Sequence, residues 1–381
     1  MRKSIKTILA ALALAMPLVL TSCEGTLDDI FGEWDRPSGN ANSGSNTPGE
    51  TIVKYKAYNS ESGTFEEKQI TVFTLITSST TTLEAGTYVV EGNVTIDGNV
   101  IIGGEIELVL SDGATLTING DFNSGGDSSA KIYGQSSGTG KLIINTTTDE
   151  LSSINLNDLV MNGGEIEVNC TGNKGYGINT GGDFYMYGGK ITATATKRAI
   201  NIQSGCKFYM VGGEVNVTGT SYTETGGAVR GGWGINGEIN MSGGTFTAHG
   251  GDSGAYDATT GCEGGLGING NISISGGTLS TYGGKGGPGT TTRGPGGCGA
   301  AATLTYSGGN VISIGGEYGT GSGSNGNGQC LNQIINNTGA TLQYDYCSLP
   351  VNWATATTGS IPGGSNTVLG TTQHAARIPH E

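Results

Sequence analysis

The chain has 381 residues, of which 72 are glycine and only 8 are proline, and its formal net charge is −14. The first 22 residues hold three of the 18 basic residues and no acidic one, so the rest of the chain has a net charge of −17. This acidity, without a Lys/Arg cluster, disfavours nucleic acid and anionic lipid surfaces as partners. Glycine without a three-residue period along the chain excludes a collagen.

The N-terminus has the organisation of an export signal. A basic start, with Arg2, Lys3 and Lys6, is followed by an apolar run at 8–20. This run is shorter than the roughly 20 apolar residues that a membrane-spanning helix needs. The sequence therefore predicts a signal peptide over residues 1–22, which is set aside before the fold is considered.

The four residues "LTSC" that end at Cys23 resemble the lipobox of bacterial lipoproteins. The acidic stretch that follows, "EGTLDDIFGEWDRP", resembles the surface-export signal of Bacteroidota lipoproteins, although Gly25–Leu27 splits its acids. Glu24 after the cysteine argues against inner-membrane retention. The resemblance implies lipidation of Cys23, with palmitate among the acyl chains, and an outer-membrane protein exposed at the cell surface. The alternative is an ordinary secretory signal that happens to contain a cysteine.

Residues 23–50 are predicted to form a flexible tether. They end in "SGNANSGSNTPGE", a small and polar segment that has no means of packing a core.

A repeat occupies the middle of the chain, and "INMSGGTFTAHGG" (239–251) is one copy. Each copy places two apolar residues two positions apart, then Gly-Gly, then two more apolar residues with the same spacing. In the last copy, the apolar residues after Gly-Gly are displaced by one position, to Val311 or Ile312. The Gly-Gly pairs begin at Gly163, Gly188, Gly212, Gly243, Gly276 and Gly308.

Each repeat holds about three short strands, which is too little to fold alone, but stacked repeats bury a continuous core with roughly 4.8 Å between coils. The sequence therefore predicts an all-β fold, a right-handed parallel β-helix (solenoid) over residues 51–329. The alternating apolar residues of 72–145 form its first coils. Residues 330–381 lose the pattern and are predicted to be a C-terminal capping segment, because an uncapped stack exposes strand edges.

Four asparagines follow an inward isoleucine at equivalent positions, and a hydrogen-bonded ladder of their amides is predicted. Four unrelated loop asparagines are the alternative. They are Asn179, Asn201, Asn236 and Asn269.

Six cysteines remain after Cys23, and an even number in an exported chain permits disulfides, whose connectivity cannot be deduced from the sequence. Stacking of Cys262 on Cys298 is one candidate, and pairing of Cys330 with Cys347 is another.

Three segments carry a family resemblance: "LSDGATLTING", "KIYGQSSGTGKLII" and the recurring "GIN…SGGTFTA". They are similar to Gly-rich right-handed parallel β-helix surface lipoproteins of Bacteroidota and to β-helix carbohydrate-binding domain proteins, over roughly residues 85–315. The resemblance implies this fold and recognition of a polysaccharide, sometimes with calcium.

Catalytic residues are not apparent, and the prediction is that the protein is not an enzyme and has no cofactor. A glycoside hydrolase needs two carboxylates across the sugar bond, but the outward positions beside Met186, Met210, Met241 and Ile274 are not acidic. Lys197–Arg198 and Arg230 are isolated in the sequence. A degenerate polysaccharide lyase or hydrolase is the weakest of three hypotheses.

Three tyrosines are the candidate carbohydrate-binding residues. Tyr185 and Tyr209 precede their Gly-Gly pairs by three residues, and Tyr187 precedes its pair by one. Their neighbours Phe184 and Met186 are inward, so the tyrosines should face outward, one coil apart, as a platform for a sugar ring. The alternative is that they stack only to stabilise the sheet. Tyr176 and Trp233 are interpreted as core residues.

Two Gly-rich loops, 250–265 and 283–297, leave the repeat at the same corner. Insertions on one edge of a repeat array often build its binding face, so a second candidate face is formed by Asp252, Tyr256, Asp257 and Glu263. These acids are either solvated or a weak calcium site, and the loops are either a binding surface or floppy linkers.

The leading hypothesis is a surface-anchored lipoprotein that binds extracellular polysaccharide without turning it over. The alternative is a structural adhesin or surface spacer with a protein ligand.

Overall fold

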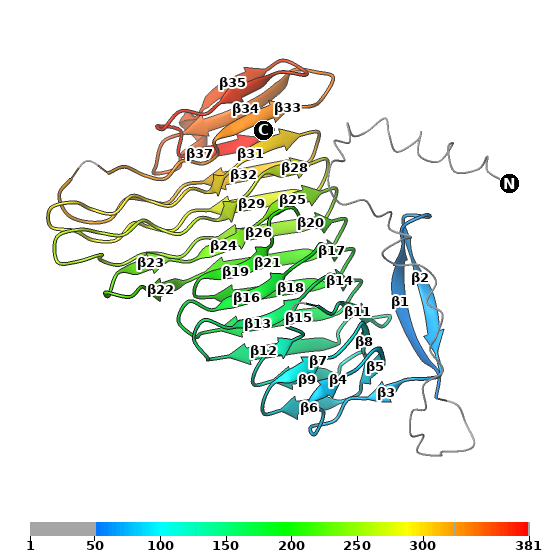
Figure 1. The fold of residues 1–381 in the computed structure, drawn as a ribbon. Coiled ribbons are helices and arrows are strands. Elements are labelled where there is room, and N and C mark those ends of the chain that lie inside the picture. Colours follow the sequence, from blue (N-terminus) through cyan, green and yellow to red (C-terminus); the bar gives the residue numbers. More distant parts are fainter. Residues whose placement is uncertain (1–50, 126, 324, 380–381) are drawn as a thin grey trace. The chain divides into compact units, whose positions relative to one another are not determined.

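The structure is a computed structural model that describes residues 51–379 except Gly126 and Ser324. The predicted signal peptide, Cys23 and the tether lie outside the described residues. Thr51–Glu381 forms one compact unit. It is all-β, and its strands form three long sheets and two short hairpins (Figure 1).

The three long sheets have nine, twelve and twelve strands. The first contains, in spatial order, β30 (Ala300–Ala301), β27 (Ile268–Asn269), β24 (Trp233–Asn236), β19 (Arg198–Ile202), β16 (Tyr176–Thr180), β13 (Ser152–Leu156), β10 (Phe122–Asn123), β7 (Val100–Ile102) and β4 (Thr82–Leu83). The second contains β3 (Thr74–Leu75), β5 (Gly86–Val90), β8 (Ile106–Leu110), β11 (Ala130–Gly134), β14 (Leu159–Met161), β17 (Phe184–Met186), β20 (Lys207–Met210), β25 (Glu238–Met241), β28 (Ile272–Ile274), β31 (Thr303–Tyr306), β33 (Gln333–Asn336) and β36 (Asn366–Val368). The third contains β6 (Asn93–Ile96), β9 (Thr115–Ile118), β12 (Lys141–Thr146), β15 (Glu165–Cys170), β18 (Lys190–Ala195), β21 (Glu214–Gly219), β26 (Thr245–His249), β29 (Thr278–Tyr282), β32 (Asn310–Ile314), β37 (Ala375–Ile378), β34 (Leu342–Cys347) and β35 (Thr357–Ile361).

Through most of its length the chain contributes one strand to each of the three sheets in turn, for example β13, β14 and β15. We call one such set of three strands a rung. Successive rungs pair in parallel, as Ile154 with Ile178 and Leu159 with Phe184 do. Figure 1 shows this stacking from β6 and β9 to β31 and β32. The last strands, β34 to β37, pair antiparallel instead, and a short 3-10 helix, η1 (Trp353–Thr355), lies among them.

The boundaries of the parallel part differ from those predicted. Residues 51–73 do not form a rung, because β1 (Val53–Asn59) and β2 (Thr64–Ile70) make an antiparallel hairpin. Parallel pairing begins at β3 and β4. It continues past residue 329, since β33 (Gln333–Asn336) still pairs in parallel with β31.

The core is continuous across the rungs, because the strands alternate buried and outward residues. Phe184, Phe208 and Phe246 are fully buried. Their rings meet edge to face, with centroids 4.7 Å apart for Phe184 and Phe208 and 5.4 Å apart for Phe208 and Phe246.

Each of the six Gly-Gly pairs turns the chain from the second sheet into the third, as predicted. The second glycine of each pair has a φ between 79° and 89°, which only glycine adopts at low cost. Space is also limited, because a Cβ on Gly189 would lie 2.6 Å from the carbonyl oxygen of Gly164. These corners therefore explain why the pair recurs in the sequence.

The asparagine ladder is confirmed and is longer than predicted. Each amide nitrogen donates to the side-chain oxygen of the asparagine one rung before it, over 2.6–3.1 Å. Its members are Asn123, Asn155, Asn179, Asn201, Asn236 and Asn269. The ladder runs along the first sheet and fixes the register of its short strands.

Three long loops follow β26, β29 and β32 of the third sheet, and they project together on one side (Figure 1). The first two lead to the first sheet, and the last leads to β33 of the second sheet. Each loop runs outward and returns, and its backbone hydrogen-bonds to the neighbouring segments over 2.7–3.2 Å. We call this assembly the glycine array. One column of these bonds joins Thr220, Gly232, Gly251, Gly265, Gly284, Gly297, Gly316 and Gly328. The interpretation as floppy linkers is therefore wrong.

Glycines in the outgoing segments recur every third residue, at Gly251 and Gly254, at Gly284 and Gly287, and at Gly316 and Gly319. Three residues per turn is the period of an extended helix without internal hydrogen bonds, which leaves the N–H and C=O groups for neighbouring segments. A Cβ at five of these six positions would overlap the backbone of a preceding segment, and a Cβ on Gly254 would lie 2.9 Å from the Cβ of Val229. Thus the composition of the loops reflects close packing.

The six cysteines of the described residues are free thiols. Cys262 does not stack on Cys298, because its backbone bonds to Gly254 and Gly287, whereas the Cys298 carbonyl accepts from Gly267. Burial raises the pKa of Cys330 to about 12, so this thiol is a weak nucleophile at neutral pH.

Candidate functional site

Two outward tyrosines lie on adjacent rungs of the second sheet, as the spacing predicts. Tyr185 in β17 pairs in register with Tyr209 in β20. Their rings are stacked with centroids 4.9 Å apart and planes 7° apart. Phe184 and Met186 on either side are buried. We call Tyr185 and Tyr209 the tyrosine pair.

Tyr187 also faces outward, but it is covered. The ring of Tyr58, from β1, stacks on it at 4.4 Å between centroids and 11° between planes. The Tyr58 backbone N–H donates to Asn162 Oδ1 over 2.8 Å, and Phe65 packs edge-on against Tyr58. Tyr187 also stacks on Tyr185, with centroids 6.3 Å and planes 15° apart. Rings thus lie against Tyr187 from both Tyr58 and Tyr185, and the three-tyrosine platform is reduced to a pair.

The covering hairpin packs on the second sheet through one face of β1. Val53, Val89, Val109 and Tyr133 form a small apolar cluster of their own. Tyr55 lies on Tyr133 with centroids 4.6 Å apart. This packing leaves the tyrosine pair at the edge of the covered area.

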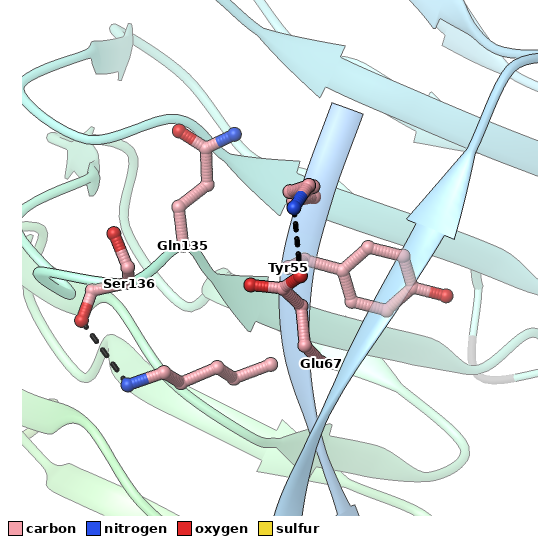
Figure 2. Close-up of a pocket in the computed structure, with 6 residues that line it drawn as sticks. Tyr55, Glu67, Gln135 and Ser136 are labelled. Carbon is pink, nitrogen blue, oxygen red and sulfur yellow. Dashed lines mark hydrogen bonds and ion pairs between the residues drawn. The ribbon is translucent and has the colours of Figure 1, made fainter. Parts of the chain in front are cut away.

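A small pocket lies beside the hairpin (Figure 2), lined by Tyr55, Glu67, Gln135 and Ser136 and by two lysines. Lys54 pairs with Glu67 at 2.9 Å, and Lys56 donates to the Ser136 carbonyl over 3.2 Å. The pocket volume is about 140 Å³, below the roughly 300–1,000 Å³ of small-molecule sites. Its lysines are already engaged, so it is a poor site for a ligand.

Two carboxylates lie next to the tyrosine pair, and the sequence analysis did not single them out. The Tyr185 hydroxyl donates to Asp183 Oδ2 over 3.1 Å. Asp183 Oδ1 accepts the Lys207 N–H, and Asp158 Oδ1 accepts the Asp183 N–H, both over 2.8 Å. Burial and the Asp183 charge raise the pKa of the Tyr185 hydroxyl. Thus Tyr185 keeps its proton at neutral pH and remains a hydrogen-bond donor.

Burial raises the pKa of Asp158 above its ordinary value; hydrogen bonds from Asp183, Ser129 and Asn157 oppose this, and the Asp183 charge adds to it. A raised pKa means that the folded state holds the proton more tightly than the unfolded chain, where the pKa is about 3.9. Ionisation of Asp158 therefore lowers the free energy of unfolding. This loss is absent below the unfolded-state pKa, grows as the pH rises, and is complete above the folded-state pKa.

We expect the difference in unfolding free energy between Asp158→Asn and the parent protein to shift in favour of the variant as the pH rises from about 3 to about 7. Urea denaturation across this range measures it. Loss of a hydrogen bond alone would change the free energy of unfolding by the same amount at every pH. A difference between variant and parent that does not vary with pH would therefore contradict the raised pKa of Asp158.

Beyond Tyr209, the same outward column continues with polar residues, Asn240, Ser273 and Thr305, each in register with the last. Beside it, Lys207 and Glu238 form an ion pair at 3.5 Å. Aromatic faces followed by amide, hydroxyl and charged groups are the groups that bind a sugar ring and its hydroxyls. The surface suits an extended ligand.

The four loop residues lie on the loop after β26, whose outgoing and returning segments bond to each other through Gly251 and Gly265 and through Gly254 and Cys262. Asp252 lies on an outgoing segment, where its carboxylate accepts the Lys285 N–H over 2.7 Å, whereas Glu263 lies on the returning segment. Tyr256 and Asp257 lie at the loop tip. Asp257 Oδ1 accepts three hydrogen bonds from Thr259 and Thr260, and these lower its pKa.

These acids do not converge on a cation. Within the described part of the chain, no group of three His, Cys, Asp or Glu side chains is placed to hold a metal ion. Calcium binding there has no support from the arrangement of Asp252, Asp257 and Glu263.

Tyr176 and Trp233 are not core residues, which corrects the sequence interpretation. Both are only partly buried, and each lies against the guanidinium of Arg198. The two-residue alternation fails in both strands, because Gly177 and Ile178, and likewise Gly234 and Ile235, are buried in succession.

No family model, curated protein or solved structure matches this chain. Among the described residues there is no helix of the length and apolarity required to cross a membrane.

Proposed function

We propose that this protein is a surface-anchored lipoprotein that binds extracellular polysaccharide without turning it over. The single observation that carries the proposal is the stacked tyrosine pair on the outer face of the second sheet, with Asp183 at its edge. Tyr185 stacks between Tyr187 and Tyr209, so the face of the Tyr209 ring that Tyr185 does not cover packs on the apolar side of a pyranose. The tyrosine hydroxyls and the Asp183 carboxylate bind the hydroxyl groups of the sugar.

The proposal includes the architecture that presents this site. The three sheets form a right-handed parallel β-helix, and the antiparallel strands β34 to β37 cap its end. Rotation of the chain through the sheets and the antiparallel pairing of β34 to β37 support this arrangement. A solenoid with outward residues repeated on every rung suits an extended ligand better than a small one.

The proposal also includes a lipid anchor. Cys23 carries the lipid, and the tether separates the folded unit from the outer membrane. The "LTSC" sequence and the acidic residues after it support lipidation and surface exposure.

A structural adhesin or spacer is the second candidate. The observation that favours it is the glycine array, whose backbone is bonded from Thr220 to Gly328 without a break. Such an assembly is stiff, as a spacer requires.

The double variant Tyr185→Ala/Tyr209→Ala tests the tyrosine site. We expect it to weaken retention on a polysaccharide affinity gel at least tenfold, which corresponds to a loss of about 1.4 kcal/mol. Both rings are removed together so that neither is left without its stacking partner.

Tyr256→Ala is the matched control, since this loop tyrosine is 54% exposed and lies far along the chain from the pair. Its retention should equal that of the parent protein. If Tyr185→Ala/Tyr209→Ala is retained as the parent is, and Tyr256→Ala loses retention, the binding site lies at the loop tips and not at the tyrosine pair.

A further inference from the structure

A second group of aromatic and charged residues lies on the first sheet, away from the tyrosine pair. Tyr176, Arg198 and Trp233 occupy the same register position on three successive rungs. The Arg198 guanidinium lies 5.7 Å from the Tyr176 ring centroid and 4.7 Å from that of Trp233. The Lys197 ammonium lies 5.2 Å from the Tyr176 ring.

The short hairpin of β22 (Ser221–Thr223) and β23 (Val229–Gly231) adds two more members. Tyr222 pairs across it with Arg230. Asn173 holds the hairpin, because its side chain donates to the Thr223 carbonyl and accepts the Thr223 N–H, over 2.9 and 2.7 Å. Burial and the charge of Glu224 raise the pKa of Tyr222, whereas the charges of Arg230, Lys197 and Arg198 lower it, so Glu224 and the three cations all lie near its hydroxyl.

Three cations of this group have no carboxylate partner in ion-pair contact within the part of the chain that the structure describes. Among the described residues, no Asp or Glu oxygen lies within 4.0 Å of a charged nitrogen of Lys197, Arg198 or Arg230. Glu224 and Glu150 both pair with Lys174 instead, at 2.9 and 3.9 Å, and Glu224 interacts with Arg230 and Lys197 only at longer range, where their charges help to lower its pKa. Glu263 faces Arg230 only at longer range, where the arginine opposes the rise in its pKa.

This arrangement is unexpected in so acidic a chain. Acidic residues outnumber basic ones 32 to 18, so carboxylates were available to pair with these three cations. Arg198 is also held in place, since it lies between two rings and its Nη1 donates to Asn201 Oδ1 over 2.8 Å. A fixed guanidinium loses little entropy when it binds an anion.

We infer that the cluster of Tyr176, Lys197, Arg198, Tyr222, Arg230 and Trp233 is a second binding site, and that its ligand is a sugar carrying an anionic group. The cations bind the anion, and the aromatic rings pack on the pyranose. This site lies on a different sheet from the tyrosine pair, so the inference does not rest on the proposed function. If the cluster only held the hairpin, it would need no excess of positive charge.

Saturation-transfer difference NMR and titration of the full chain with single sugars test this inference. The probes are glucuronate, galacturonate, N-acetylneuraminate and glucose 6-sulfate, beside glucose and galactose as neutral parents. We expect at least one acidic sugar to bind tenfold or more tightly than the neutral sugars, with weaker binding at high salt. The sulfate and carboxylate probes distinguish the two kinds of anion.

Lys197→Gln/Arg198→Gln should reduce this binding at least tenfold. Lys197→Gln/Arg230→Gln leaves the stacked arginine in place, so it tests the charge if the first variant is unfolded. Lys68→Gln, which removes an exposed lysine of β2 that pairs with Glu66 at 3.0 Å, is the control and should bind the acidic sugar as the parent does. Equal binding of acidic and neutral sugars, or undiminished binding by both glutamine variants, would overturn the inference.

Discussion

Replacement of Gly265 by alanine is expected to destabilise the protein by about 3 kcal/mol, at the upper end of the usual cost of overpacking. The backbone of Gly265 donates to Gly251 and accepts from Gly284, each over 2.8 Å. An added Cβ would overlap the Gly232 carbonyl oxygen and lie 2.8 Å from the Gly251 nitrogen. Both obstacles are backbone atoms, so no side chain can rotate away to relieve the overlap.

Urea denaturation of the variant measures this loss, with Gly326→Ala as its matched control. Gly326 belongs to the same array, but a Cβ there would meet no atom within 4 Å, so its change should stay within about 0.5 kcal/mol. Equal stability of the two variants would show that the segments are not packed as the structure has them.

Phe208→Ala is expected to cost about 4 kcal/mol, because it removes a fully buried ring and leaves a cavity. The ring contacts Phe184 in the same sheet and Phe246 in the third sheet. Its loss therefore weakens the contact between sheets as well as the stacking of rungs.

The control for this variant is Thr247→Ala, an outward residue beside Phe246, whose change should stay within about 0.5 kcal/mol. Thermal and urea denaturation compare the two. A loss below about 1 kcal/mol for Phe208→Ala would contradict a core shared by the sheets.

The regular parts of the fold were predictable because their cause is local and repeated. Gly-Gly turns such as Gly188–Gly189 recur at a fixed distance from alternating apolar residues, and this spacing determines which side chains face inward. The asparagine ladder followed from the same alignment, since Asn179 and Asn201 occupy equivalent positions. The register of Tyr185 with Tyr209 followed from it as well.

Contacts between distant parts of the chain were not predictable from the repeat. Tyr58 covers Tyr187 from more than a hundred residues away, and no spacing within the repeat indicates a hairpin above the sheet. Asp183 was missed because only the positions beside Met186 were considered as outward. The gathering of Lys197, Arg198 and Arg230 depends on β22 and β23 folding back onto earlier rungs.

The glycine array did leave a signal in the sequence. The triplets "GGD SGA", "GGK GGP" and "GGE YGT", which begin at Gly250, Gly283 and Gly315, align with one another. Their three-residue spacing was overlooked because the period was judged over the whole chain.

A glycan-array screen of residues 51–381, with and without calcium, tests the central claim most directly. The proposed function predicts retention on at least one polysaccharide, with no change when calcium is removed. Absence of retention on every glycan would contradict polysaccharide binding and favour a structural adhesin or spacer.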